Sequence, residues 1–310
     1  MQQFLGIGIV LACVFGGYVI NGGAFHAIWQ PVELLIIGGA GVGAMVLGNP
    51  LHVLREMLVQ MRQVVILRRQ GQEFQRQLLL LMYELLQIAA GGLKALDAHV
   101  EAPHESELFK RYPMILHEPK LLHFIVDNFR LMAMGKISAH ELEGVLDQEI
   151  EAIYEEMAQP ARSLSKVGDA MPGFGILAAV LGIVMAMKSV ASGADTGEVA
   201  VAVAAAMVGT FIGIFMCYGV LDPISNRMRQ LVDDERQALD SVKVVLVTHV
   251  AGKPPLLAID AGRRLVQLNT KPSFARLESW IDKLNNPEGA AEEPATPRRR
   301  KGDLRAQQAA

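Results

Sequence analysis

The four long apolar runs of this 310-residue chain contain no charged residue in their interiors. They are Phe4–Ile20, Val32–Gly48, Ala170–Met187 and Val199–Leu221, and the nearby charges lie only at their rims, at Glu33, Asp169, Lys188, Glu198 and Asp222. A bilayer core takes roughly 20 apolar residues of helix, and tilt or flanking residues accommodate shorter runs. A solitary ion transporter normally keeps a charged group inside the membrane. We therefore predict four transmembrane helices, and we expect any ion-binding group to come from a partner chain.

The sequence also lacks the motifs of enzymes and of metal or nucleotide sites. Its only cysteines, Cys13 and Cys217, lie inside apolar runs, where they are expected to act as small apolar side chains. The eight histidines are scattered, and neither a His-Glu-x-x-His nor a Cys-x-x-Cys pattern occurs. We predict no catalytic residue, no metal site, no bound cofactor and no nucleic-acid partner.

Basic residues are missing from the two loops that join the paired runs. Of the 29 lysines and arginines, 13 lie between positions 51 and 168, 15 lie after position 222, and Lys188 is the remaining one. Cytoplasmic loops carry the excess of basic residues in membrane proteins. This asymmetry predicts that both hairpin tips face outward and that the N- and C-termini are cytoplasmic. The first run lacks the basic flank of a signal peptide, so we expect it to be retained.

These features predict an all-α membrane protein with two transmembrane hairpins and a large helical cytoplasmic domain. The expected parts are two membrane helices in 1–50, a cytoplasmic domain in 51–168, two further membrane helices in 169–222, a helical region in 223–285 and a disordered tail in 286–310. Breaks are expected at Gly91-Gly92 and Gly135, with a long acidic helix from Ser138 to about Glu156. The basic run 298–301 in the tail either touches anionic lipid or only adds solubility.

Small residues recur four apart within the runs. Gly39-x-x-x-Gly43 places two bare backbone patches on one helix face, and Gly175-x-x-x-Ala179 and Ala205-x-x-x-Gly209-x-x-x-Gly213 repeat the spacing. Such faces permit close helix contact. The contact is either within one bundle or between several chains.

Two prolines and one threonine stand out by position. Pro172 opens the third run, where a proline at a helix start is tolerated easily. Pro223 ends the fourth run at a point where the helical pattern continues, so it is expected to kink the backbone. Together they predict either a hinge at the cytoplasmic membrane face or two ordinary boundary prolines. Thr210 either bonds a carbonyl of the preceding turn or lines a hydrated path.

Five ordered motifs resemble the MotA family of flagellar motor stator subunits over about residues 1 to 285. They are Gly16-Gly17-Tyr18, Gln30-Pro31-Val32-Glu33-Leu34, Glu105-Ser106-Glu107-Leu108-Phe109, the segment from Val167 to Gly175, and the segment from Ala206 to Gly213. The resemblance implies a homo-oligomeric ring, taken as a pentamer, around two chains of a MotB-like single-span peptidoglycan-binding protein. It implies that the partner carries the proton-binding aspartate, in the bacterial inner membrane, and that the ring pushes on the rotor protein FliG.

The resemblance also assigns residues. Pro172 and Pro223 match functionally important prolines, and Thr210 and Ala179 match positions that face the ion path. Sodium-driven relatives carry threonine at the position of Ala179, so protons are the expected ion.

The rotor-facing residues match the family less closely. Asp97 matches a rotor-facing acid, whereas the expected basic position falls at Ala89 or Ala90, so Lys94 is the alternative source of that charge. Glu149 matches a further acid, although a solvated acidic face explains it equally.

Other functions stay open. One is an energy transducer like ExbB or TolQ that serves an outer-membrane system, another is a channel that needs no partner, and a third is a sodium-driven stator. The extended cytoplasmic region 51–167 and the match at Gln30-Pro31-Val32-Glu33 favour a flagellar motor over the energy transducer.

Overall fold

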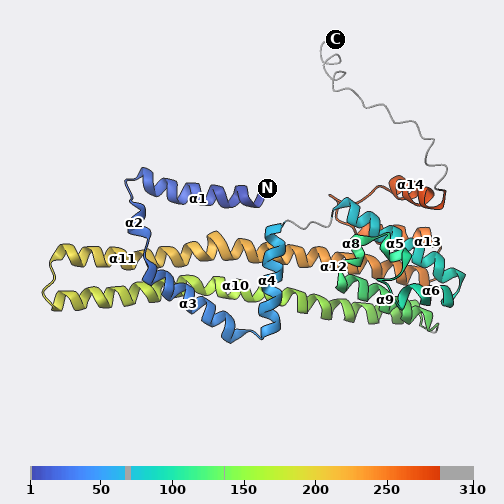
Figure 1. Ribbon diagram of the computed structural model, residues 1–310, viewed down its shortest axis with the longest axis horizontal. Coiled ribbons are helices and arrows are strands. Elements are labelled where there is room, and N and C mark those ends of the chain that lie inside the picture. The colour runs from blue at the N-terminus through green and yellow to red at the C-terminus, as the bar shows by residue number, and fades with distance from the viewer. Residues whose placement is uncertain (1, 67–70, 136, 287–310) are drawn as a thin grey trace, which may run out of the picture. The chain divides into compact units, whose positions relative to one another are not determined.

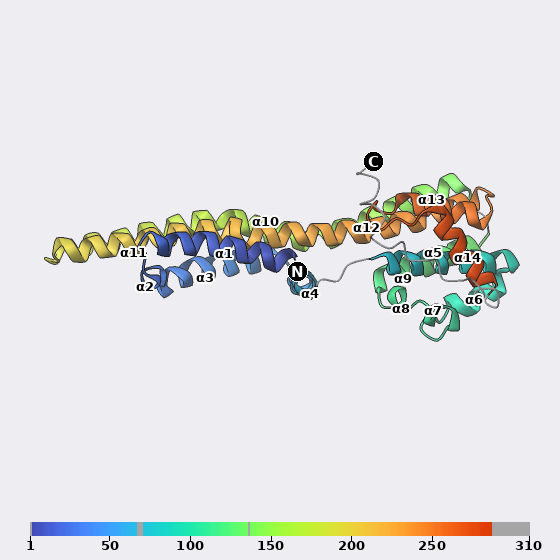
Figure 2. The same ribbon diagram turned by 90° about the horizontal axis from the view of Figure 1, so that it is seen from above.

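The computed structural model describes residues 2–66, 71–135 and 137–286, and every regular element in these ranges is a helix. The chain divides into two compact units. Unit 1 comprises Met1–Gln70 and Glu141–Leu239, and unit 2 comprises Gly71–His140 and Asp240–Ala310. Figures 1 and 2 label the helices of both units. The all-helical prediction is confirmed for the described residues, whereas the predicted tail lies beyond residue 286 and outside them.

Unit 1 holds the apolar helices of the chain. Its elements are α1 (Gln2–Ile20), α2 (Phe25–Ile28), α3 (Pro31–Gly48), α4 (Leu51–Ile66), α11 (Thr196–Phe215), the π-helix η1 (Met216–Leu221) and most of α10 (Ala139–Ala191) and of α12 (Asp222–Val250). Three continuous helical stretches are long and apolar enough to cross a membrane: Pro31–Gly48, Ala139–Ala191 and Thr196–Val250. The apolar stretch of α1, Leu5–Ile20, is shorter. Three of the four predicted spans therefore have the necessary length, and the span in α1 stays a prediction.

Helices α10 and α11 run antiparallel and side by side in both views (Figures 1 and 2). The turn between them is closed by Asp195, whose side chain accepts a hydrogen bond from the backbone N–H of Glu198 at 2.8 Å. A side chain at this N-cap position satisfies a backbone donor that the helix itself leaves open. The hairpin predicted from the third and fourth apolar runs is thus present.

Unit 2 packs shorter helices around α5 (Gln72–Gly91). The others are α6 (Leu93–Val100), α7 (Glu107–Lys110), α8 (Pro113–Leu116), α9 (Pro119–Ala133), the last turns of α12, α13 (Pro255–Leu265) and α14 (Phe274–Asn285). The predicted breaks are confirmed, because Gly92 and Gly135 have φ values of 122° and 74°. Side chains other than glycine rarely adopt this left-handed backbone, so both helices end there. Contacts of α5 with α6, α8 and α13 bury most of its length.

The long helix α10 corrects one expectation. The position of Pro172 predicts a helix start, but α10 starts at Ala139 and continues without a break to Ala191, with Pro160 and Pro172 inside it. A proline inside a helix removes a backbone hydrogen bond and crowds the preceding turn. Pro172 is therefore a local defect in a continuous helix. A proline in this position is less easily explained as an ordinary helix start than the sequence suggests.

Candidate ion-path and hinge site

The contact between α10 and α11 depends on glycines. A methyl group built on Gly175 would lie 2.8 Å from the carbonyl oxygen of Gly209, and one on Gly213 would lie 2.6 Å from that of Met171. Neither position tolerates a side chain without a shift of backbone, so the two helices approach at backbone-to-backbone distance. The spacing of small residues predicts such a contact. For these three glycines the contact lies within one chain.

Two predicted ion-path residues, Thr210 and Ala179, lie along this contact. Ala179 is 9% exposed, and its backbone nitrogen is 3.5 Å from a methyl group built on Gly209. Thr210 is half-buried, with its Cα atom 3.3 Å from a methyl group built on Gly175. The structure therefore brings both residues to the same pair of facing helices, and their role in the ion path stays a prediction.

The two predicted hinge prolines flank an irregular segment of the same hairpin. Pro223 follows closely after η1, the six-residue π-helix Met216–Leu221, and is exposed. A proline lacks the N–H that would bond the carbonyl four residues earlier, and single π turns absorb such defects. Pro172 is half-buried in α10, and nearby Gly168 approaches Leu221, whose Cβ would lie 3.2 Å from an added methyl group.

A buried cluster joins the two irregular points. Val167 and Met171 on α10 pack with Cys217 of η1 and with Ile37 of α3, and partly buried Met216 and Leu221 pack against them. Pro172 therefore follows Met171, which packs against η1, and Pro223 follows η1, which packs against α10. The buried Cys217 serves here as a small apolar side chain, as predicted, whereas Cys13 is exposed on α1.

The predicted rotor-facing residues belong to different units. Asp97 is exposed on α6 of unit 2, and Glu149 is half-buried on α10 of unit 1. Lys94 belongs to α6, but its side chain lies outside the described residues. The acidic face of α10 is partly paired, since Glu151 accepts from Arg236 of α12 at 2.9 Å, and this arginine also lies 4.3 Å from the ring centre of Tyr154. The role of Asp97, Lys94 and Glu149 at the rotor therefore stays a prediction.

Sequence reasoning overlooked Glu33, which it placed at a membrane rim. The residue lies in the first turn of α3 but is only 8% exposed. Its Oε1 atom is 3.6 Å from a methyl group built on Gly182, which itself would lie 2.7 Å from the Cβ of Ala206. Gly182 precedes the end of its apolar run at Met187 by about 7.5 Å of helix. The carboxyl group therefore lies within the apolar depth of α10 and α11.

The side-chain carboxylate of Glu33 has no ion pair or hydrogen bond among the residues that the structure describes. An ionisable group in a membrane helix normally faces a bundle interior or a hydrated path. The gap of four between Glu33, Ile37 and Gly41, the three buried residues of α3, is the signal in the sequence that could have indicated this burial.

The chain matches two family descriptions and several known proteins. Residues 4–92 match "Motility protein A N-terminal", and residues 120–241 match "MotA/TolQ/ExbB proton channel family". The chemotaxis protein LafT of Vibrio parahaemolyticus is 50% identical over 285 residues, which cover 91% of this chain and 98% of LafT. Motility protein A of Salmonella typhimurium is 38% identical, covering 93% of this chain and 97% of that protein.

Two solved structures share the fold. The first, the structure of C. jejuni MotAB, aligns with a TM-score of 0.69 at 18% identity and covers 88% of this chain and 98% of that one. The second, the flagellar MotAB stator complex of Bacillus subtilis, aligns with a TM-score of 0.63 at 22% identity and covers 89% and 98%. These families are channels and stators rather than enzymes. The relatives and the two family matches show that the chain is a multi-pass membrane protein that belongs to the MotA family of flagellar motor stator subunits.

Proposed function

We propose that this chain is the ring-forming subunit of a proton-driven flagellar stator in the bacterial inner membrane. Five copies surround the transmembrane helices of a MotB-like partner, which supplies the proton-binding aspartate and anchors the complex to peptidoglycan. The two solved structures of the same fold are named as MotAB, which supports this partner. In this proposal residues 1–50 and 169–222 form the membrane part, and both termini and the segments 51–168 and 223–285 are cytoplasmic.

The observation that carries the proposal is the junction of Pro172, η1 and Pro223. Both prolines interrupt the backbone hydrogen bonding of helices that pack against each other through Val167, Met171 and Cys217. Freed carbonyl groups make these points easier to bend than regular helix. A proton that binds and leaves beside this hairpin can change the bend of both helices, and α10 and α12 carry that change toward the cytoplasmic end of the chain.

Ala179 at the α10–α11 contact supports protons as the conducted ion. Ala179 offers no hydroxyl oxygen, and a sodium ion needs several oxygen ligands in place of its water. Protons need only one titratable group, which the partner supplies. Swimming speed should therefore be independent of sodium and should fall to zero with a protonophore. A sodium requirement would instead assign this chain to a sodium-driven stator.

The cytoplasmic part is proposed to push on the rotor protein FliG. Asp97 supports this role because its carboxylate is exposed on α6. The match of residues 4–92 to the Motility protein A N-terminal description favours the motor over an energy transducer like ExbB or TolQ. A neighbouring gene for a single-span peptidoglycan-binding protein would agree, whereas a TonB-like neighbour would contradict the motor.

Proline variants test the hinge. Pro172→Ala and Pro223→Ala restore a backbone donor, so each should stiffen the junction, leave the complex assembled and abolish most swimming. Pro160→Ala is the matched control, because Pro160 lies inside the same helix but is buried away from the junction, and it should swim normally. Motility is scored in soft agar, and assembly by purification with the partner. Normal swimming of both hinge variants would refute the proposal.

A further inference from the structure

Helix α4 (Leu51–Ile66) lies at the edge of the membrane part of unit 1. Only Asn49 and Pro50 separate it from the end of α3, which is long and apolar enough to cross a membrane. In both views α4 runs across α10 and α12 rather than along them (Figures 1 and 2). Because α10 and α12 continue the helices of the membrane hairpin, a helix that runs across them lies along the membrane surface. Helix α4 therefore keeps the depth at which α3 ends.

One face of α4 is fixed to the helices of unit 1. Val53, Met57 and Val64 are buried at helical spacing, and the last two join a cluster with residues of α10 and α12. Gln60 of the same face donates a hydrogen bond to the backbone carbonyl of Met157 at 2.9 Å. These contacts fix the rotation of α4 about its axis, so the side of the helix on which every other residue lies follows from its position in the turn.

The neighbouring face of α4 is apolar and largely uncovered. It carries four apolar residues at gaps of three and four, Leu51, Leu54, Leu58 and Met61. Leu51 and Leu58 are 73% and 68% exposed. Neighbouring exposed apolar side chains of this size mark a surface that contacts lipid or another protein.

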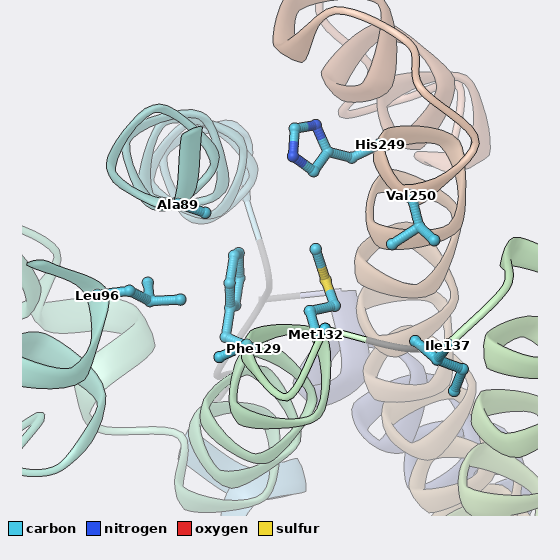
Figure 3. A pocket seen from close by; sticks show the side chains of 9 residues that line it. Ala89, Leu96, Phe129, Met132, Ile137, His249 and Val250 are labelled. Atoms are coloured by element: carbon cyan, nitrogen blue, oxygen red, sulfur yellow. The ribbon is translucent and has the colours of Figure 1, made fainter. Parts of the chain in front are cut away.

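Helix α9 of unit 2 is amphipathic as well, but it buries its apolar face. Phe129 of α9 and Leu96 of α6 line the same pocket, and Figure 3 shows both side chains directed into it. In water, burial of an apolar side chain stabilises the folded protein, so an amphipathic helix covers this face. The exposure of Leu51 and Leu58 is instead typical of a helix that lies in the membrane interface with its apolar face toward the acyl chains.

Two arginines border the apolar face of α4. Arg55 and Arg62 are seven residues apart, so they lie on the same side of the helix, next to Leu51 and Leu58. Both are exposed, and neither side chain has an ion pair or hydrogen bond within the described part of the chain. Arginine side chains lay their methylene groups along apolar surface and keep the guanidinium group in the polar layer. Both guanidinium groups are therefore available to a negative group at the membrane surface.

The nearby charged groups are already engaged or lie elsewhere on the helix. Glu56 is the only acid of α4, lies on the opposite flank from Leu58, and has a contact of its own. On the adjacent turns of α10 and α12, Arg162 pairs with Glu155, and the side chain of Arg229 donates a hydrogen bond to the hydroxyl group of a serine of α10. These groups do not compensate the two arginines of α4.

Cations outnumber acids at the depth of α4. On the segments beside it, 161–169 of α10 and 222–231 of α12, the charged residues are Arg162, Lys166, Asp169, Asp222, Arg227 and Arg229. A second copy of the chain at the same depth would bring the same positive surplus, so charge disfavours it as a cover for the arginines. Anionic lipids of the cytoplasmic leaflet bring negative phosphate groups. They also bring acyl chains for the neighbouring leucines.

We propose that α4 binds the phosphate groups of anionic phospholipids in the cytoplasmic leaflet through Arg55 and Arg62, with Leu51 and Leu58 inserted among the acyl chains. The choice of leaflet rests on the orientation proposed above, whereas the lipid contact rests on α4 itself. Leu221 of η1 packs against the same cluster as the buried face of α4. A lipid-bound α4 therefore holds the cytoplasmic side of the junction of Pro172, η1 and Pro223 at a fixed depth.

Lipid binding to the purified complete stator complex tests the arginines. Native mass spectrometry follows titration with phosphatidylglycerol, phosphatidylethanolamine or phosphatidylcholine of the same acyl chains. Phosphatidylglycerol should bind most tightly, and Arg55→Gln and Arg62→Gln should each weaken its binding about fivefold, the gain expected from one basic residue at an anionic surface. Arg55→Lys should keep most of the affinity. Lys253→Gln is the control, because Lys253 is exposed in unit 2 and is not part of α4, and it should leave the affinity unchanged.

Two results of this titration would contradict the proposal. The first is equal affinity of wild type and the double variant Arg55→Gln/Arg62→Gln for phosphatidylglycerol. The second is a smaller oligomer of the double variant without weaker lipid binding, which would make this face of α4 a contact between copies. Co-purification of each variant with its partner shows that the complex is intact.

Cysteine labelling in inside-out membrane vesicles tests the depth of the apolar face independently of lipid affinity. His52 and Leu58 are both exposed but lie on different faces of α4. A water-soluble maleimide should modify Leu58→Cys about tenfold more slowly than His52→Cys, because the hydrocarbon region excludes water; wild type gives the background of the native cysteines. Equal rates would overturn the insertion of this face and the proposal with it. Labelling of His52→Cys only in right-side-out vesicles would overturn the cytoplasmic leaflet together with the orientation proposed above.

Discussion

Helices α3 and α5 have similar lengths but differ in which side chains they bury. On α5, the leucines and the methionine of Leu78–Met82 and Leu85–Leu86 are almost fully buried. On α3, which is more apolar, only Glu33, Ile37 and Gly41 are buried, while Leu35 is 74% exposed. The helix with the greater apolar content thus exposes its leucine side chains and buries its carboxylate.

The difference shows which environment each helix is built for. In water, burial of apolar surface drives folding, so a leucine-rich helix such as α5 is surrounded by its own unit. In a bilayer the lipid tails are as apolar as leucine, so a membrane helix keeps leucines outside and uses small and polar residues for contacts. Unit 2 completes its own core, whereas the spans of unit 1 depend on lipid and on other chains.

The glycine contacts of unit 1 should give the largest effect. Gly213→Val places two methyl groups against the carbonyl of Met171, so α10 and α11 must separate, at a cost of roughly 3 kcal/mol or more. We expect little folded complex, measured as the yield of protein that resists protease in membranes.

Gly39→Val provides the contrast, because nothing lies within 4 Å of a methyl group at that position. This variant should fold and should lose only contacts between chains, seen as a smaller oligomer after purification. Equal yields for Gly213→Val and wild type would show that the close contact of α10 and α11 is not required.

The ion pairs of unit 2 should give an intermediate effect. Asp260 is buried on α13 and accepts from Arg263 Nε at 2.7 Å and from Arg264 Nε at 2.9 Å. Burial alone would raise the pKa of this carboxyl, but the two arginine hydrogen bonds outweigh it and hold the pKa below its ordinary value. Asp260→Asn should therefore destabilise unit 2 by about 2 kcal/mol at neutral pH, measured by thermal unfolding of the intact complex.

The contacts of Asp260 with Arg263 and Arg264 also predict how the stability of unit 2 depends on pH. Because the folded pKa is lowered, the stabilisation is complete above the unfolded value near pH 4 and is lost as the pH falls through the folded value. The difference between wild type and Asp260→Asn should thus be constant near neutrality and shrink only in acid. A difference that shrinks between pH 8 and pH 6 would assign the effect to another group.

What the sequence could predict depended on how local each feature is. The glycine breaks at Gly92 and Gly135 and the hairpin of the third and fourth apolar runs follow from residues close together in the chain, and the structure confirms these breaks and the hairpin. The place of Pro172 inside α10 was missed, because continuity of a helix through a proline depends on packing from the opposite helix. The burial of Glu33 was missed for the same reason, since it requires knowing that Gly182 and Ala206 lie against it.

Glu33→Gln should give the smallest change in stability. This variant tests directly what the buried carboxylate of α3 costs. A buried carboxyl group without a partner costs free energy that a neutral amide of the same shape largely avoids. The variant should therefore be more stable than wild type by about 1 kcal/mol, seen as slower thermal loss of the complex. If the carboxyl group also serves the ion path, swimming should become slower although the protein is more stable, and Glu33→Asp should keep more of the speed. If Glu33 has a structural role alone, the more stable Glu33→Gln variant should swim at least as fast as wild type, because each complex that survives longer in the membrane would drive the rotor for longer.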